Sequence, residues 1–143
     1  MTARILFVCT GNSVRSQMAE GLARALAAPG VEVASAGTHP AGVNPLALEA
    51  MRDRGIDISA QRSKRVEDLP GEFDYVITLC DDAAQNCPTL PARRARLHWS
   101  VVDPGSAAGD EHTRRQFFHQ IRDDIERRLR EWLGREGLLG NAR

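Results

Sequence analysis

The chain has few aromatic residues, no excess charge of either sign and no long apolar run. Aromatic residues make up 5% of its 143 positions, and 19 basic residues balance 19 acidic ones. This balance gives no electrostatic reason to expect a nucleic-acid or membrane partner. No apolar run approaches the roughly 18 residues of a membrane span, and the first residues do not form a secretory signal. We therefore expect a cytoplasmic protein that works as a monomer.

Cysteine is also scarce, and an odd number of cysteines does not form a disulfide scaffold. The three cysteines are Cys9, Cys80 and Cys87. In a reducing compartment they should be free thiols at rest, which leaves catalysis, metal binding or plain burial as their use. The spacings are not those of a zinc site, and the histidines are scattered along the chain: His39, His98, His112 and His119.

Strand-like and helix-like segments alternate along a chain of single-domain length. Short apolar runs predict strands at residues 3–8, 31–36, 75–79 and 97–101. Helical spacing of apolar residues predicts helices at 16–27, 44–54, 63–69 and 113–133. This alternation predicts an α/β fold, a three-layer sandwich with a central four-stranded parallel sheet flanked by helices. We expect one catalytic domain over residues 1–133 and a frayed tail over residues 134–143.

Three polar side chains follow three of these strands. Cys9 comes directly after the first strand, Cys80 after the third and Asp103 after the fourth. Ligands of parallel sheets bind beyond the carboxyl ends of the strands. The sequence therefore predicts that these side chains meet at one edge of the sheet.

The segment CTGNSVRS forms the most informative motif. Arg15 follows Cys9 at a Cys-x5-Arg spacing, and the residues between join a strand to a helix. Their free amides and the helix N-terminus predict an oxyanion-binding loop, to which the Arg15 guanidinium would add a planar fork of donors. The same positive surroundings favour the nucleophilic thiolate of Cys9. The loop residues are Thr10, Gly11, Asn12, Ser13, Val14, Arg15 and Ser16.

Asp103 is the candidate general acid, because a carboxyl group near the leaving oxygen can protonate it during nucleophilic attack. In isolation, the Asp-Pro-Gly sequence that contains it is a turn signal. Its position after a strand, together with the Cys-x5-Arg loop, favours the catalytic interpretation.

Five segments carry a resemblance to a known family: CTGNSVRSQMAEG, SAG, GVNPLALEAM, TLCDDAAQNCPTLP and HWSVVDP. In this order they resemble thioredoxin-coupled arsenate reductases, which have the low-molecular-weight tyrosine phosphatase fold. The resemblance implies that Cys9 attacks arsenate held by the loop and Arg15, while Asp103 protonates the departing oxygen. A Cys9–Cys80 disulfide and then a Cys80–Cys87 disulfide would follow, and thioredoxin, not a bound cofactor, would supply electrons.

The resemblance also implies a cation site, because some family members bind potassium. Asn12, Glu20 and Ser35 match three of its ligands, but Lys64 stands where the family has an aspartate. We expect no metal there: either the Lys64 ammonium replaces the ion and pairs with Glu20, or Lys64 is solvated and the site is absent.

Two other functions compete with arsenate reduction. A phosphotyrosine phosphatase would use Cys9, Arg15 and Asp103 without needing Cys80 or Cys87, and weak phosphatase side activity is expected because arsenate and phosphate share a shape. A metal-binding or arsenic-sensing module would use the three thiols as ligands, but their spacing does not favour it.

Overall fold

The computed structural model describes residues 3–81 and 91–140 of the chain, and Cys87 lies outside them. Its elements alternate along the sequence as expected. They are β1 (Ala3–Cys9), α1 (Arg15–Leu26), β2 (Val31–Gly37), α2 (Pro45–Asp53), the short 3₁₀ helix η1 (Val66–Asp68), β3 (Phe73–Thr78), β4 (Ala92–His98), the 3₁₀ helix η2 (Pro104–Ser106) and α4 (Glu111–Glu136).

The four strands form one parallel sheet in the order β2-β1-β3-β4, which confirms the predicted sheet. Cys9 pairs with Gly37, Val8 with Thr78, and Thr78 with His98. All carboxyl ends therefore meet at one edge. Since the chain moves from β1 to β2 on one side and then returns to β3 on the other, β1 and β3 flank the switch point where such sheets bind ligands.

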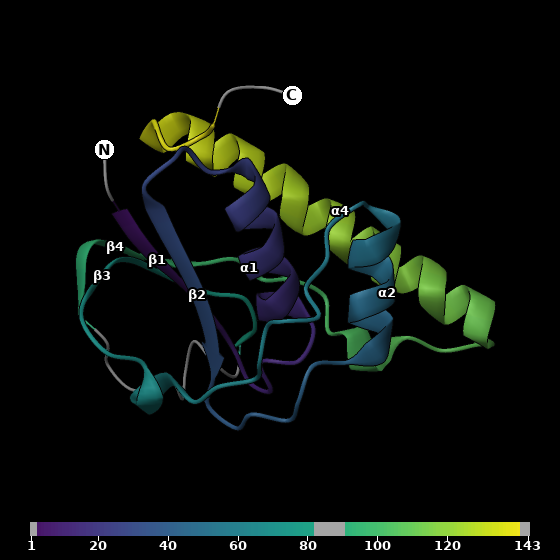
Figure 1. The fold of residues 1–143 in the computed structure, drawn as a ribbon. Coiled ribbons are helices and arrows are strands. Elements are labelled where there is room, and N and C mark those ends of the chain that lie inside the picture. Colours follow the sequence, from purple (N-terminus) through teal and green to yellow (C-terminus); the bar gives the residue numbers. More distant parts are fainter. Residues whose placement is uncertain (1–2, 82–90, 141–143) are drawn as a thin grey trace.

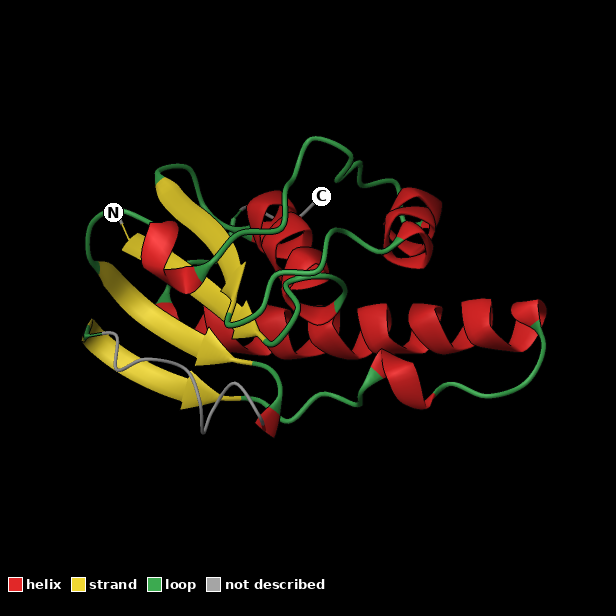
Figure 2. Ribbon diagram, turned by 90° about the horizontal axis from the view of Figure 1, so that it is seen from below, coloured by secondary structure: helices red, strands yellow, loops and turns green. Residues whose placement is uncertain are grey.

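The side chains of β1 alternate between the two faces of the sheet. Ile5 and Phe7 join the larger core cluster, to which α1, α2 and α4 contribute. Leu6 and Val8 join a smaller cluster on the other face, where Val66 of η1 packs. Figure 1 shows α1, α2 and α4 gathered on one side of the sheet, and Figure 2 shows the strands running side by side toward the loops that build the site.

The long helix α4 covers the larger core with one apolar stripe, as its spacing predicted. Phe118 is buried in this stripe, whereas Phe117 is only partly buried. The other buried members are Ile121, Ile125, Leu129, Trp132 and Leu133. Burying each large apolar side chain contributes about 1.5–3 kcal/mol, so this stripe is a main source of fold stability.

The predicted boundaries differ from the structure mainly at β4 and η1. The strand expected at residues 97–101 is Ala92–His98, because the exposed arginines of ARRARLH hide its alternating pattern. Residues 99–101 still follow the sheet, since Trp99 N donates to Thr78 O and Val101 N to Leu79 O. The helix expected at residues 63–69 is reduced to one 3₁₀ turn at Val66–Asp68.

The end of α4 also differs from the expected frayed tail. The helix continues to Glu136 and closes on Gly137, whose φ of 72° gives a left-handed C-cap. Leu138 is then buried, and the amide of Gly140 donates to Leu26 O at the end of α1. A buried leucine and backbone pairing hold residues 138–140 against α1, which sequence periodicity does not reveal.

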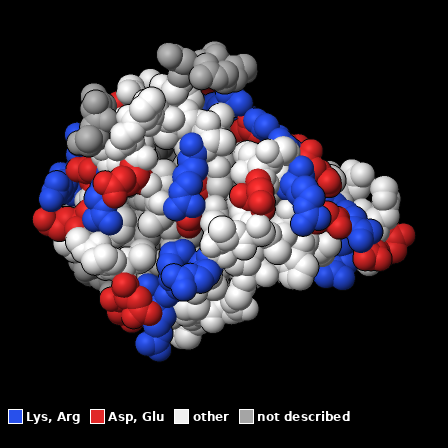
Figure 3. All heavy atoms as spheres, in the orientation of Figure 1, with Lys and Arg blue, Asp and Glu red and all other residues white. Residues whose placement is uncertain are grey.

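Charged side chains of both signs are interspersed over the face that Figure 3 shows. Within the described residues, no helix is both long and apolar enough to cross a bilayer.

Candidate active site

The loop between β1 and α1 lies at the switch point of the sheet. Asn12 adopts a left-handed conformation with φ of 46°, which Asn tolerates better than most residues. The N-cap of α1 is Val14, which makes no side-chain capping bond. The first amides of α1 are therefore available to an anion, as is typical of helix N-termini that bind phosphate-like groups.

Cys9 ends β1 and is 2% exposed. Its Sγ lies 2.8 Å from Ser16 Oγ, and Asn12 Nδ2 donates to the same hydroxyl oxygen at 2.8 Å. Because Ser16 Oγ accepts from Asn12, its own proton is free to be donated to the sulfur.

Both polar atoms of the Asn12 side chain make hydrogen bonds that hold the loop. Its Nδ2 also donates to Ser35 Oγ at 2.9 Å, and its Oδ1 accepts from Lys64 N at 2.8 Å and from Gln17 Nε2 at 3.0 Å. A side chain bonded to three other segments fixes the unusual backbone conformation at Asn12. Among the described residues, no buried side-chain nitrogen or oxygen lacks a hydrogen-bond partner.

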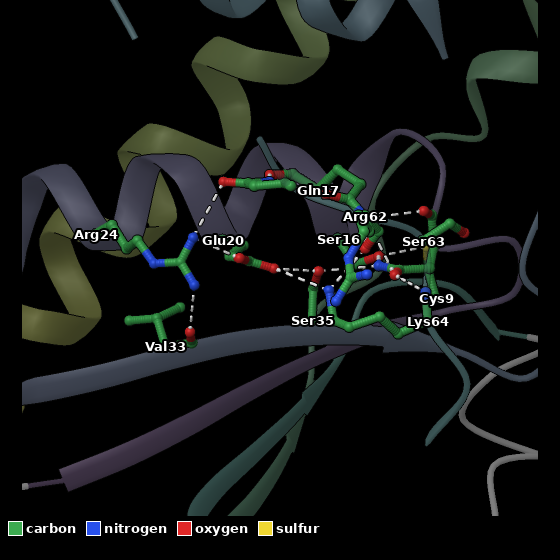
Figure 4. A network of polar contacts seen from close by, with 12 residues as sticks. Cys9, Ser16, Gln17, Glu20, Arg24, Val33, Ser35, Arg62, Ser63 and Lys64 are labelled. Atoms are coloured by element: carbon green, nitrogen blue, oxygen red, sulfur yellow. Dashed lines mark hydrogen bonds and ion pairs between the residues drawn. The ribbon is translucent and has the colours of Figure 1, made fainter. Parts of the chain in front are cut away.

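Behind the loop, Glu20 is 3% exposed and lies among positive groups (Figure 4). Ser35 Oγ donates to its Oε1 at 2.6 Å, and Arg24 pairs with its Oε2 at 2.5 Å. Lys64 Nζ lies 3.7 Å from Oε1 and donates to Arg62 O at 2.7 Å. Burial lowers the pKa of Lys64, and the Glu20 carboxylate opposes that shift. Of the two alternatives for Lys64, the contact with Glu20 is thus the one present, and Lys64 is partly desolvated.

Arg15 and Asp103 meet at the mouth of the loop. The Arg15 side chain donates to Val101 O at 3.1 Å, and its guanidinium lies 4.0 Å from Asp103 Oδ1. Asp103 is exposed and caps η2 by accepting a bond from Gly105 N at 2.8 Å. The turn that Asp-Pro-Gly signals therefore also places the carboxylate at the site.

Cys80 follows β3 and is buried at the same place. Its Sγ lies 3.3 Å from Thr10 Oγ1 in the loop. One pocket is lined by Cys80, Thr10, Arg15 and Asp103. The convergence predicted from the strand ends is therefore present for the segments of Cys9, Cys80 and Asp103. Cys87 lies outside the described residues, as does any contact that it makes.

Three contributors to the site were missed in the sequence. Gln17 is fully buried and donates to Asn12 and to Arg62 O, although polar residues usually face solvent on such helices. Ser63 Oγ donates to Gly11 O at 3.0 Å. A Cβ at Gly37 would lie 2.6 Å from Thr10 O, so only glycine lets the end of β2 approach the loop this closely.

The pocket can hold a small tetrahedral oxyanion beside the Arg15 guanidinium and the Cys80 thiol, and Cys9 directly precedes Thr10 of its lining. Cys9 can act as a nucleophile, and Asp103 can exchange a proton with a leaving oxygen. The Cys80 sulfur can attack Cys9 Sγ once that sulfur has bonded to another atom. Among the described residues, no group of three or more potential metal-ligating His, Cys, Asp or Glu side chains is found.

Comparisons with known proteins point to the same chemistry. The chain matches the model of the low molecular weight phosphotyrosine protein phosphatase family over residues 4–139. An arsenate reductase from Bacillus subtilis (strain 168) is 46% identical over 129 residues, which cover 90% of this chain and 93% of that protein.

Solved structures are similar over nearly the whole chain. One, an arsenate reductase in the oxidized state, is 31% identical, with a TM-score of 0.77 and coverage of 94% of this chain and 98% of that chain. A thioredoxin-dependent arsenate reductase from Corynebacterium glutamicum is 32% identical, with a TM-score of 0.66 and coverage of 93% of this chain and 61% of that chain.

Proposed function

The chain belongs to the low molecular weight phosphotyrosine protein phosphatase family, and from this premise we propose that it is an arsenate reductase with Cys9 as its nucleophile. The observation that carries the proposal is a second thiol, Cys80, which lies 3.3 Å from Thr10 of the loop and lines the same pocket as Arg15. A phosphatase needs one thiol, whereas reduction of arsenic(V) to arsenic(III) takes two electrons, which two thiols supply by forming a disulfide. The name of the Bacillus subtilis relative supports arsenate as the substrate.

In the proposed first step, the Cys9 thiolate attacks arsenic in arsenate bound by the loop amides and Arg15. An arsenic–oxygen bond breaks, and the oxygen leaves as water after Asp103 and solvent supply protons. The donors of the loop and of Arg15 stabilise the charge on the oxyanion. This step forms a sulfur–arsenic bond without changing the oxidation state of arsenic.

In the second step, the Cys80 thiolate attacks Cys9 Sγ. The electron pair of the sulfur–arsenic bond passes to arsenic, which leaves as arsenite, and a Cys9–Cys80 disulfide forms. Cys87 would then attack Cys80, which frees the Cys9 thiolate and leaves a Cys80–Cys87 disulfide. Thioredoxin would reduce this last disulfide and become oxidised itself. The name of the Corynebacterium glutamicum structure supports thioredoxin as the donor.

We further propose that the Lys64 ammonium takes the place of a cation beside Glu20. The residues present do not fit a potassium ion, because Lys64 Nζ already lies 3.7 Å from Glu20 Oε1, and Asn12 Oδ1 accepts two hydrogen bonds. Arsenate turnover and melting temperature should therefore be equal in potassium and in sodium at constant ionic strength. Strong activation by potassium would contradict this proposal and favour a true ion site.

A coupled enzyme assay with thioredoxin tests the proposed function. Thioredoxin, thioredoxin reductase and NADPH are mixed with the protein, and NADPH oxidation is followed after arsenate is added. We expect arsenate-dependent oxidation with the wild type and its loss in Cys87→Ser, which lacks the third thiol. Equal turnover of both proteins would contradict the three-thiol order, and no turnover of either would contradict arsenate reduction with this donor.

Phosphatase activity is the second candidate, because Cys9, Arg15 and Asp103 also suit a phosphate ester. The described residues that line the pocket include no aromatic side chain to hold a phenol ring. We therefore propose only weak hydrolysis of aryl phosphates. Release of phosphate from an aryl ester without any arsenate turnover would make the phosphatase the main function and leave the role of Cys80 to be found.

A further inference from the structure

Asp81, the residue after Cys80, is tied to the neighbouring strand by a histidine. The Nε2 of His98, at the end of β4, lies 2.9 Å from Asp81 Oδ1. The Nδ1 of the same ring lies 2.8 Å from Thr78 Oγ1, a buried hydroxyl at the end of β3. Ser100 Oγ also donates to Asp81 Oδ1, at 3.5 Å. We call the pair of Asp81 and His98 the clasp.

The His98 ring can donate a hydrogen bond to Asp81 whether the ring is neutral or protonated. In the neutral form, Thr78 donates to Nδ1 and the Nε2 proton goes to the carboxylate. In the protonated form, Nδ1 donates to Thr78 Oγ1, and the hydroxyl turns its proton to Leu97 O, which lies 3.4 Å away. Nε2 donates to Asp81 in both cases, so the clasp is closed in both.

The clasp fixes one side of Cys80, and the sheet fixes the other. Leu79 N donates to Val8 O at 2.8 Å, and Leu79 O accepts from Val101 N at 3.1 Å. Cys80 therefore lies between a residue held by backbone bonds on both sides and a residue held by its side chain. Its sulfur lies beside Thr10 of the oxyanion loop, 3.3 Å from Oγ1.

We propose that the clasp of Asp81 and His98 is a positioning pair that holds the Cys80 thiol against the oxyanion loop for its attack on Cys9. This inference rests on the proposed function, because it concerns the second step of that sequence. Thiol exchange requires the attacking sulfur to approach along a defined line, and small displacements of a reacting group can slow a step by about a hundredfold. Neither clasp residue touches the reacting atoms, so both act through Cys80.

The charge of Asp81 makes the inference more specific. Asp81 lines the same pocket as Arg15, and a carboxylate there repels an arsenate anion. Asp81→Asn keeps an oxygen that accepts the bond from His98 but removes the charge. We expect this variant to bind arsenate or phosphate more tightly, by about twofold to fivefold, since exposed charges interact only weakly. Its rate of disulfide formation should stay within about threefold of the parent.

Two variants of His98 distinguish the hydrogen bond at Nε2 from the hydrogen bond at Nδ1. The amide nitrogen of Gln can reach the position of Nε2, whereas the amide of Asn reaches only that of Nδ1. His98→Gln should therefore keep the bond to Asp81, and His98→Asn should lose it. Asp81→Ala also opens the clasp and cannot harm the core, because the Asp81 side chain is 76% exposed.

The matched control is a second histidine–aspartate pair far from the pocket. His119 Nε2 on α4 lies 3.0 Å from Asp53 Oδ2 at the end of α2. His119→Asn removes a bond of the same kind and should leave the chemistry unchanged.

The experiment uses the Cys87→Ser protein, in which the proposed reaction stops at the Cys9–Cys80 disulfide. Each variant is mixed rapidly with excess arsenate and quenched in acid, and its remaining thiols are alkylated and counted by mass spectrometry. We expect disulfide formation to be about tenfold slower or more in His98→Asn and Asp81→Ala. His98→Gln and His119→Asn should stay within about threefold of the parent, and phosphate binding by His98→Asn should not weaken.

If His98→Asn and Asp81→Ala form the disulfide as fast as His119→Asn, the proposed role of the clasp is overturned. It is also overturned if His98→Gln is as slow as His98→Asn, because the ring would then act through packing. If the parent forms no disulfide with arsenate at all, the proposed function fails instead, so the two failures are distinguishable.

Discussion

At the scale of the residue, Ser16 connects Cys9, the proposed nucleophile, to the rest of the site. Its hydroxyl lies between Cys9 Sγ and Asn12 Nδ2, each 2.8 Å away, and it is fully buried. The Asn12 amide is in turn held by Ser35 and Lys64. Because Asn12 donates to Ser16 Oγ, the Ser16 proton can be donated to the sulfur, and Ser16 links the loop to Cys9.

Replacing Ser16 by Ala should slow the reaction of Cys9 with electrophiles. A hydrogen bond to a charged group contributes about 1.5–3 kcal/mol, so alkylation of Cys9 by iodoacetamide at neutral pH should slow by about tenfold or more. Mass spectrometry assigns the label to Cys9 and not to Cys80.

The matched control is Ser13→Ala, which changes a serine of the same loop and should react at the wild-type rate. Melting curves confirm that each variant is folded at the temperature of the assay. An alkylation rate for Ser16→Ala equal to that of Ser13→Ala would show that this hydroxyl does not stabilise the thiolate.

Single residues of the site divide into those that sequence could predict and those it could not. Cys9, Arg15 and Ser16 lie within one short motif, so local spacing is enough to place them together. The contact of Lys64 with Glu20 was one of two alternatives that a resemblance raised. Gln17 could not be found, because the amphipathic pattern of α1 assigns no polar residue to the interior. Its partners Gln61 and Arg62 come near only in the folded chain.

At the scale of the element, α2 and α4 are joined by an ion pair at the end of α2. Arg54 donates to Glu126 by two bonds of 2.9 Å, and Glu126 also accepts from Arg130 at 3.0 Å. The hydrogen bond from Arg54 is the main reason that the pKa of Glu126 lies below its usual value of 4.5. The same bond raises the pKa of Arg54.

Glu126→Gln should lower the free energy of unfolding by about 1 kcal/mol at neutral pH, the range for a partly exposed pair with good geometry. The lowered pKa gives the sign of the pH dependence. The carboxylate stabilises the native state above its unfolded pKa, near 4.5, and this contribution is lost as the pH falls through the lower native pKa. The wild type should therefore lose more stability than the variant between about pH 5 and pH 3.

Urea unfolding at several pH values measures this difference. Glu131→Gln, an exposed position on the same helix, is the control and should change the stability little. A gap between wild type and Glu126→Gln that stays constant down to pH 3 would contradict the assignment to the carboxylate.

The elements themselves were largely predictable, and the exceptions have physical causes. Asn44 and Pro45 are local signals for the start of α2, and in the structure the Asn44 side chain accepts from Leu46 N. The edge strand β4 was misplaced because its exposed arginines leave little apolar alternation. The end of α4 was placed too early because the packing of Leu138 against α1 is a tertiary contact.

At the scale of the whole molecule, the sheet gathers groups that lie far apart in the sequence. The parallel registers of β1, β2 and β3 bring the loop after Cys9, the glycine that ends β2 and the thiol after β3 to one edge. This convergence was predictable, because parallel strands must end together. The close approach of Gly37 to Thr10 was not, because it depends on how far each strand extends.

Since the site is assembled from so many segments, an oxyanion that binds it should stabilise the entire fold. A ligand that binds only the native state adds about 2.7 kcal/mol to the free energy of unfolding at a hundred times its Kd. For a chain of about 150 residues this corresponds to a rise in Tm of roughly 5–10 °C. Phosphate, a non-reducible analogue of arsenate, should therefore raise the Tm in a concentration-dependent way.

Arg15→Gln should lose most of this shift, because the guanidinium, 13% exposed and held by Val101 O, faces the pocket as its fixed positive charge. Arg127→Gln removes an exposed arginine of α4 and keeps the overall change in charge the same. We expect Arg127→Gln to follow the wild-type curve at constant ionic strength. If phosphate raises the Tm of both variants equally, the stabilisation comes from general salt effects and not from the loop. If only Arg15→Gln loses the rise in Tm, binding at the oxyanion site stabilises the whole molecule. The reason is that this site joins segments from the ends of β1, β2 and β3.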